Sequence, residues 1–481
     1  MQRTRPAGRL NQRVSTAALL GAIVLATPAV AEDRGGPIAV GDFPSLQAAL
    51  DAHPGQALHV PAGDYAIDAP LVLRHSGSAL SGPGRIVQTN PLAPIVVVED
   101  AEHVAIRDLT LTRPEAAAET DEPAVRASNS DFVRLQGLRV LGNHSRSAAI
   151  RLEQCAYGRV EGCEIVDYKR VSIDDRTTNP LYGYAFQCID GSGIGATRCT
   201  ATTIVNNRII ERRMLPTREI AEAHGLGRLT AGKAPLRFGE LGKWVERANF
   251  AQHWHQGSAI VVTGPEQTSF TRIVGNYIEN SAQGIDIHSD NYICSDNVVN
   301  HAMMGMKAMH GSRNGVIANN LFSHVDLWGI MLGPGAASHR AEPASSETPE
   351  RRPNVDGAVA VTGNVIADFG RGHEFWNWTR NETDGAVSAV IRIERGQLSA
   401  NPPITDVLIQ GNVVTNGADE EQLVDGKLVA PQPRYRYVVV IEQPSGEGER
   451  GHYPRNIRVG DNLFEPGLEG VCNVPLEEHR P

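Results

Sequence analysis

Short stretches in which apolar and polar residues alternate recur along the chain, and each is separated from the next by a turn. Three of them are Val104–Leu111, Phe132–Val140 and Gly158–Ile165. Alternation with a period of two is typical of a β-strand that buries one face. Because the stretches are short and follow one another closely, they predict a stack of strands rather than a helical protein.

An asparagine motif repeats through the rest of the chain. In it, Asn follows Gly, Asn or Asp and stands two residues before Val, Ile or Phe. It occurs at Asn207, Asn276, Asn297, Asn320, Asn364, Asn412 and Asn462, in steps of 69, 21, 23, 44, 48 and 50 residues. Several steps lie near multiples of about 22 to 24 residues, a period that indicates a solenoid of stacked units.

The composition of this repeat selects the kind of solenoid. The unit is short, β-branched and rich in Asn and Gly, which predicts an all-β, right-handed parallel β-helix. Asn at a fixed turn tolerates left-handed backbone and can bond to the next coil. We therefore interpret the repeated asparagines as structural, and expect Asn276, Asn297 and Asn320 to occupy equivalent turns of consecutive coils.

The segment before the first coils predicts a cap. Phe43–Ala52 has helical periodicity, and short strands are expected near Leu58 and Tyr65, separated by Pro61–Asp64. The phrase DFPSLQAAL followed by VPAGDY resembles the N-terminal cap of pectate-lyase-like β-helix proteins. A solenoid needs such a cap because its first strands would otherwise expose an apolar cross-section.

The expected domain plan follows from these patterns. Residues 32–92 form the cap and first coils, and residues 93–481 form the β-helix. Three long insertions are expected at about 166–257, 335–357 and 415–434, the second of them as a mobile loop. Long loops on a rigid scaffold are where binding function usually lies.

The N-terminus has the features of an export signal. Four arginines precede an apolar run from Val14 to Val30, and Ala29–Ala31 has a small-x-small cleavage pattern. We expect cleavage after Ala31, which makes residues 1–31 a signal peptide and places the protein outside the cytoplasm, secreted or periplasmic. The apolar run is short for a membrane anchor, and no other stretch of the chain reads as a membrane span.

The net charge and the cysteine spacing bear on which ligands the protein is expected to bind. The chain has 45 basic and 55 acidic residues, and loss of residues 1–31 leaves 41 basic residues and a net charge near −14. An acidic surface argues against general nucleic-acid binding, but a local basic cleft can still take an acidic sugar. The six cysteines include no C-x-x-C pair, so a zinc site is not expected; buried thiols and one or two disulfides remain open.

Two neighbouring stretches carry the candidate chemistry. The first reads Gly284–Asp290 (GIDIHSD) and the second Gly305–Gly311 (GMKAMHG). If Ile285 and Ile287 point inward, Asp286 and His288 point outward. The same phase leaves Lys307 outward on the next coil, about 4.8 Å away. An acid, a histidine and a cation are then expected side by side.

The first stretch resembles a known signature. Gln283–Asp290 is similar to the YG-F/I-DPH-D/E motif of mannuronan C5-epimerases, with Asp286 and His288 at its acid and histidine. Gln283, Ile287 and Ser289 replace its tyrosine, proline and second acid. Met309–Arg313 loosely resembles a stretch of β-helix alginate and chondroitin lyases, with Met309 in place of an arginine.

Both families begin by removing the C5 proton of a uronic acid while a cation neutralises the carboxylate. The resemblance therefore implies a polysaccharide lyase or C5-epimerase. His288 would be base or acid, Lys307 base or carboxylate neutraliser, and Asp286 the group that orients His288. Further candidates are His310 as a catalytic residue and the substrate-binding residues His255, Arg313, Arg392 and Glu394.

The sequence leaves other functions open. A glycoside hydrolase would need clustered carboxylates on these coils. A non-catalytic glycan-binding or cell-surface β-helix would instead present exposed aromatics such as Trp376 and Trp378. No cofactor is required by the motifs, and calcium remains an alternative through Asp286, Asp290 and Asp296. The expected partner is a polysaccharide, most simply an acidic one.

Overall fold

The structure is a computed structural model. It describes residues 38–115, 119–173, 187–215, 233–235, 244–246, 257–344, 349–372, 389–396, 398, 400–416, 422–424, 426–429, 432–444 and 452–475. The expected signal peptide, His255, Trp376 and Trp378 lie outside these residues. In the described part, no helix has the length and apolar character needed to cross a membrane.

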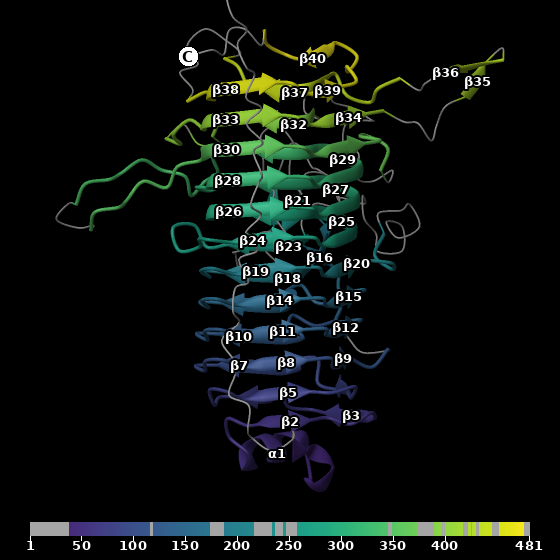
Figure 1. Ribbon diagram of the computed structural model, residues 1–481, viewed down its shortest axis with the longest axis vertical. Coiled ribbons are helices and arrows are strands. Elements are labelled where there is room, and N and C mark those ends of the chain that lie inside the picture. The colour runs from purple at the N-terminus through teal and green to yellow at the C-terminus, as the bar shows by residue number, and fades with distance from the viewer. Residues whose placement is uncertain are drawn as a thin grey trace, which may run out of the picture. The chain divides into compact units, whose positions relative to one another are not determined.

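The described residues from Ile38 onward form a stack of coils whose strands make three parallel sheets (Figure 1). The first sheet runs in the order β1 (Ile38–Ala39), β2 (Ala57–His59), β5 (Ala79–Ser81), β8 (Ala105–Arg107), β11 (Arg134–Gln136), β14 (Arg159–Glu161), β19 (Thr203–Val205), β24 (Arg272–Val274), β26 (Asp290–Ser295), β28 (Arg313–Ala318), β30 (Gly357–Thr362), β33 (Thr405–Gln410) and β38 (Arg455–Gly460).

The second sheet contains β4 (Leu71–Leu73), β7 (Val96–Glu99), β10 (Val125–Ser128), β13 (Ala148–Glu153), β18 (Ser192–Thr197), β23 (Ser258–Thr263), β25 (Tyr277–Ile287), β27 (Val298–Ala308), β29 (Leu321–Leu332), β32 (Ala389–Ile393), β37 (Tyr437–Ile441) and β40 (Gly470–Cys472).

The third sheet contains β3 (Asp64–Ile67), β6 (Arg85–Gln88), β9 (Thr110–Thr112), β12 (Arg139–Leu141), β15 (Glu164–Val166) and β20 (Arg208–Ile210). It continues through β25, β27 and β29 to β31 (Val365–Ala367), β34 (Val413–Thr415) and β39 (Leu463–Phe464). Antiparallel pairs β16 (Arg170–Ile173) with β17 (Gln187–Asp190), β21 (Lys233–Pro235) with β22 (Trp244–Glu246) and β35 (Gln422–Val424) with β36 (Lys427–Val429) complete the strands.

Strands β25, β27 and β29 differ from the others because each runs through two sheets. They have 11, 11 and 12 residues, whereas most other strands have three to six. Asn280, His301 and His324 adopt positive φ near 55° within them, which turns the backbone around the corner without breaking the ladder. These long strands lead directly into the candidate site.

The core is built from the inward residues of the alternating pattern. Ile260, Ile285, Met306, Ile330 and Ile391 are paired in register on successive strands, and all are fully buried. Each coil thus stacks its β-branched or long apolar side chain on the next. The hydrophobic effect therefore acts continuously along the stack.

The repeated asparagines form one ladder, as expected, but the left-handed backbone falls on the residue before each of them, such as Gly275 before Asn276. The side-chain oxygen of Asn297 accepts hydrogen bonds from the backbone N–H and the side-chain amide of Asn276, at 3.0 and 2.9 Å. Asn297 in turn donates to Asn320 and to the carbonyl of Ile273. The same contacts run from Asn207 to Asn462. Each buried amide is thereby satisfied by its neighbours, which fixes the register of the coils.

The N-terminal end carries the expected helix. Helix α1 (Leu46–Ala52) follows the short 3₁₀ helix η1 (Val40–Asp42), and the Ser45 hydroxyl caps it by accepting from the N–H of Ala48 at 3.1 Å. Leu46, Ala49 and Leu50 are buried against the first coils. The helix therefore covers the apolar end of the stack, at the bottom of Figure 1.

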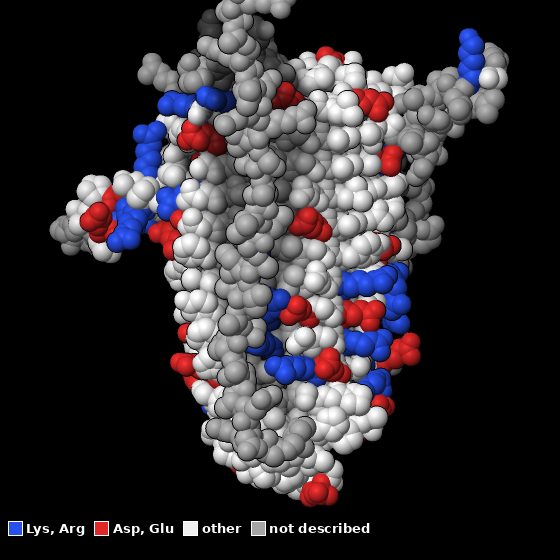
Figure 2. Space-filling model, viewed as in Figure 1, with Lys and Arg blue, Asp and Glu red and all other residues white. Residues whose placement is uncertain are grey.

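Charged residues on the third sheet alternate in sign from coil to coil. Figure 2 shows basic and acidic side chains in alternation over β12, β15 and β20. Arg139 pairs with Glu164 on the next coil at 2.9 Å, and Arg85 pairs with Asp64 at 2.7 Å. These exposed pairs contribute little free energy each, but they keep like charges apart in the stacked register.

The insertion expected to be a mobile loop has paired backbone at its base. His339 pairs with Asn354 and Glu342 with Arg351 in antiparallel fashion, which gives a hairpin arm. The arm contacts an earlier coil, because Glu266 accepts from Arg351 at 2.8 Å and lies 3.1 Å from His339.

The choice between buried thiols and disulfides is resolved for five of the six cysteines. Cys155, Cys163, Cys199, Cys294 and Cys472 are free thiols.

Candidate functional site

The candidate site lies where β25 and β27 end on the second sheet. Ile285 and Ile287 are fully buried, and Asp286 pairs in register with Lys307, as the alternation predicted. The Asp286 Oδ2 lies 3.2 Å from the Lys307 Nζ. Both side chains point away from the core, but they are more shielded than expected: 9% of Asp286 and 16% of Lys307 is exposed.

His288 completes this cluster from the turn after β25. Its Nε2 lies 3.0 Å from the Asp286 Oδ1, and its Nδ1 is 2.9 Å from the Thr263 hydroxyl. Thr263 ends β23 on the preceding coil, so both ring nitrogens contact groups of the rigid ladder. The facing atoms of Asp286 and His288 are buried, and their contact is close without the alignment of a full hydrogen bond.

Asp286 is ionised in this arrangement. Burial opposes its charge, but Lys307 and His288 outweigh burial and hold the pKa of Asp286 well below its usual range. A buried carboxylate that faces two cationic or protonatable groups is an electrostatic anchor for both. It is poorly suited to act as a proton donor near neutral pH.

His310 lies against His288, with ring centroids 4.4 Å apart in an edge-to-face arrangement. Its Nδ1 accepts the backbone N–H of Ala337 at 3.2 Å, so the neutral ring carries its proton on Nε2. Burial, together with the nearby His288 and Lys307, lowers the pKa of His310 to about 3. His310 is therefore a neutral hydrogen-bond donor at ordinary pH rather than a base.

Two residues of the 335–357 insertion hold the backbone of His310 and of the turn that follows it, and they were not identified from the sequence. Asn354 donates to the carbonyl of His310 at 2.8 Å. Asp356 accepts the backbone N–H groups of Gly311 and Ser312, both at 2.9 Å, and the hydroxyl of Ser338 at 2.5 Å. No motif marks them, because they follow His310 by more than 40 residues across a non-periodic insertion.

The predicted substrate-binding residues do not all join this cluster. Arg313, on β28, binds Asp290 at 2.8 and 3.0 Å. Arg392 is on the same row as Lys307, but the register places Met331 between them, so the strands that carry the two cations are about 9.6 Å apart. Arg392 contacts Glu394 at 2.6 Å, and both side chains are shielded.

The three aspartates of the calcium alternative do not share a site. Asp286 faces Lys307 and His288, and Asp290 binds Arg313. Asp296 accepts from Ser295 at 2.8 Å. Within the described ranges, no group of three His, Cys, Asp or Glu side chains is arranged to hold a metal ion.

Gln283 stands at the position of the tyrosine in the epimerase signature. Its side chain is buried and accepts a hydrogen bond from the Ser258 hydroxyl at 3.1 Å.

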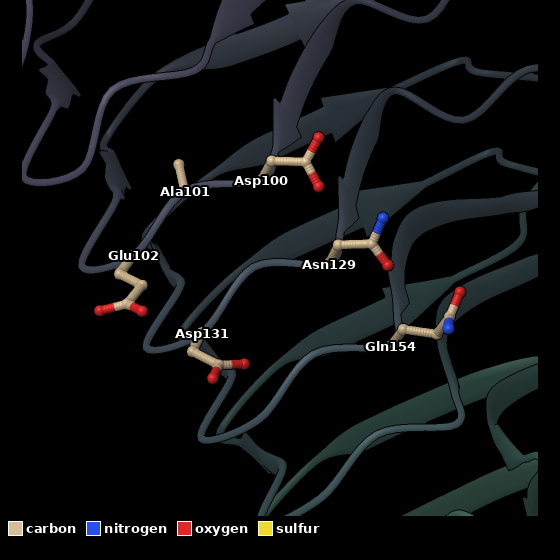
Figure 3. A pocket seen from close by; sticks show the side chains of 6 residues that line it. All are labelled: Asp100, Ala101, Glu102, Asn129, Asp131 and Gln154. Carbon is tan, nitrogen blue, oxygen red and sulfur yellow. The ribbon is translucent and has the colours of Figure 1, made fainter.

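A separate hollow of about 490 Å³ lies on earlier coils, away from His288 (Figure 3). It is lined by Asp100, Ala101, Glu102, Asn129, Asp131 and Gln154. Asp100, Asn129 and Gln154 extend in parallel from equivalent turns of successive coils, as the figure shows. The residues that line it include three carboxylic acids but no histidine, lysine or arginine, so the expected proton-transfer histidine and the cation are missing from its lining.

No family model and no curated protein sequence matches the chain. Solved structures do. The mannuronan C5-epimerase A-module AlgE4 of Azotobacter vinelandii superposes with a TM-score of 0.50 at 11% identity, covering 91% of this chain and 98% of that one. This chain is a right-handed parallel β-helix.

Two further β-helix structures match to a similar degree. The surface adhesin PfbA of Streptococcus pneumoniae gives a TM-score of 0.50 at 13% identity, covering 91% of this chain and 93% of the adhesin. The Dettilon tailspike protein gives 0.50 at 12% identity, with 87% of this chain covered. The chain spans 62% of the tailspike's length. At these identities the likeness establishes the fold, and function has to be argued from the site.

Proposed function

We propose that this β-helix is a polysaccharide-active enzyme that removes the C5 proton of a uronic acid residue, as a lyase or a C5-epimerase. The observation that carries the proposal is the shared carboxylate: Asp286 lies within 3.2 Å of both His288 and Lys307. A proton-transfer group and a cation are thus held side by side on rigid strands. The likeness of Gln283–Asp290 to the epimerase signature supports the same chemistry.

Each residue has a distinct role in this proposal. Lys307 supplies positive charge to the substrate carboxylate, which stabilises the negative charge that develops when the C5 proton leaves. His288 accepts or returns the proton, and the ionised Asp286 stabilises its imidazolium form. The neutral His310 packs edge-to-face on the ring of His288 and holds it in place. Thr263 fixes the other side of His288.

The test is isotope exchange. Alginate, polygalacturonate and chondroitin are each incubated with the protein in deuterium oxide. An epimerase incorporates deuterium at C5, which proton NMR detects, and a lyase gives an unsaturated product that absorbs in the ultraviolet. Both signals are expected to disappear in the His288→Ala variant. Absence of exchange and of unsaturated product with every uronate polymer would contradict the proposal.

One observation favours a glycoside hydrolase as the second candidate. Glu394 and Glu442 occupy equivalent positions on adjacent strands, just after β32 and β37. Burial, with the nearby Glu394 carboxylate, raises the pKa of Glu442, against the opposing effect of Arg395. Two neighbouring carboxyl groups, one of which has a raised pKa and can act as the acid, are what glycoside hydrolysis requires. New reducing ends without exchange or unsaturation, lost in Glu442→Gln, would identify this activity.

A further inference from the structure

A row of equivalent turn residues runs next to the hollow of Figure 3, because its first two members directly follow the lining residues Glu102 and Asp131 in the chain. It contains His103, Phe132, Tyr157, Ala201 and Phe270, all with positive φ between 55° and 57°. The backbone N–H of each donates to the coil that follows, which confirms that they are consecutive rungs. Side chains at these left-handed corners point to solvent, and Phe132, Tyr157 and Phe270 are 37%, 56% and 60% exposed.

The first three rungs form a stack of rings. The His103 and Phe132 centroids are 4.6 Å apart, the Phe132 and Tyr157 centroids are 4.8 Å apart, and the planes are parallel within 8°. The rings therefore stack along the axis of the solenoid at the spacing of the coils. One face of Tyr157 is covered by Phe132, and the other looks toward the rung of Ala201.

Ala201 leaves that rung empty. Tyr157 and Phe270 are two coils apart, about 9.6 Å along the axis. In the described part of the chain, the rung between them carries only the methyl group of Ala201. A ring placed in this gap would lie about 4.8 Å from each neighbour, which is the separation already seen in the stack. The gap therefore has the dimension of one six-membered ring, bounded by the free face of Tyr157.

A positively charged residue beside the gap favours a ring that carries a negative charge. Asp100, Asn129, Gln154 and Arg198 occupy a second row of equivalent turns, so the row changes from negative to positive where it reaches the coil of Ala201. Arg198 is exposed, and among the described residues it has no side-chain hydrogen bond or ion pair. The backbone and the Cγ of Arg198 pack against Gly264 of the next coil. A side chain at position 264 would clash with these atoms of Arg198.

We propose that the gap at Ala201 is a carbohydrate subsite that binds one acidic sugar ring. The apolar C–H face of the ring stacks on Tyr157, and its carboxylate binds the Arg198 guanidinium, which suits planar two-oxygen anions. The coil of Ala201 precedes that of His288 by two coils, so one chain lying along the stack can reach both. The assignment of an acidic polysaccharide rests on the proposed function, but the binding does not require catalysis.

The decisive variant is Ala201→Phe. Phe132 and Phe270 show that phenylalanine is accepted at this turn with the same φ, so the variant is expected to fold and to complete the ring stack. Titration calorimetry with hexasaccharides of mannuronate, guluronate and galacturonate measures binding in the wild type, Ala201→Phe and Arg198→Gln. The neutral control is cellohexaose. We expect at least one uronate to bind, and both variants to weaken that binding roughly tenfold or more.

Three outcomes would overturn the subsite. The first is that no uronate hexasaccharide binds the wild type, and the second is that Ala201→Phe binds the uronate as tightly as the wild type does. The third is that cellohexaose binds as well as the uronates and that Arg198→Gln weakens the binding of neither. Thermal unfolding of Ala201→Phe at or above the wild-type temperature shows that any lost binding is not lost folding. His288→Ala separates the two proposals, because it should retain binding at the gap even where turnover is abolished.

Discussion

The carboxylate of Asp286 and the ammonium group of Lys307 lie 3.2 Å apart at directly paired positions of β25 and β27. The pair is mostly shielded from water, so its energetics differ from those of the exposed pairs elsewhere on the coils. Two charges buried together cost desolvation energy that their mutual attraction only partly repays. A pair of this kind is consistent with selection for function.

Removal of Lys307 should be costly to stability. Lys307→Ala leaves the Asp286 carboxylate shielded from water beside His288 alone, and we expect a loss of about 3 kcal/mol or more in the free energy of unfolding. The double variant Asp286→Asn with Lys307→Met should recover most of this loss while remaining inactive. Denaturant unfolding measures both. A single variant as stable as the wild type would show that the pair is not effectively buried.

Lys307 should also distinguish substrates by charge. If it neutralises the uronate carboxylate, Lys307→Ala should weaken binding of the uronate polymer more than of the same polymer after carboxyl reduction. Lys307→Arg keeps the charge and serves as the matched control. Equal losses for the native and the reduced polymer would place the carboxylate elsewhere.

His288 should control turnover rather than binding. His288→Ala is expected to lower kcat by roughly 100-fold or more, the usual scale for a general acid–base group, with a much smaller change in KM. Thr263→Val removes only the hydroxyl on Nδ1 and should cause a smaller loss of kcat. Full activity of His288→Ala on the true substrate would rule out the assigned role.

Asp356 should make stability depend on pH. Burial raises its pKa to about 7, above the value of about 4 in an unfolded chain. The folded protein then binds more protons than the unfolded one between these values. Stability from this group therefore falls as pH rises from about 4 to about 7, by an amount on the order of 4 kcal/mol.

The Asp356→Asn variant tests this dependence. Relative to the wild type, its free energy of unfolding should improve steadily from pH 4 to pH 7 and then stay level. Comparing the two proteins isolates this group from His310, whose lowered pKa has the opposite effect, since it makes stability rise with pH between about 3 and 6.5. A pH-independent difference would indicate that Asp356 is ionised throughout.

The asparagine ladder should be most sensitive in its middle. Asn297→Ala leaves the N–H of Asn276 and the carbonyl of Ile273 buried without their partners, and we expect a loss of about 3 kcal/mol or more. Asn462, the last rung, is partly exposed, so Asn462→Ala should cost clearly less. Urea unfolding of both variants gives the comparison, and equal costs would argue against burial as the cause.

The sequence by itself determined the solenoid and the centre of the candidate site. Period-two alternation decides which side chains enter the core, and the coil spacing is fixed by backbone hydrogen bonds. Asn276, Asn297 and Asn320 therefore had to align, and Lys307 had to stand beside Asp286 once Ile285 and Met306 were inside. Both relationships are local consequences of a regular ladder.

Tertiary structure alone decided how the site is completed and shielded. From a long insertion whose path has no period, Asn354 reaches His310 and Asp356 reaches the turn that follows it. Thr263 meets His288 only because β23 pairs in register with β25. Met331 separates Lys307 from Arg392, since the strand carrying it adds a full coil between them. The protonation states of Asp286, His310 and Asp356 depend on burial and on neighbours from other coils, because electrostatic energy is set by distance and solvent access rather than by position in the chain.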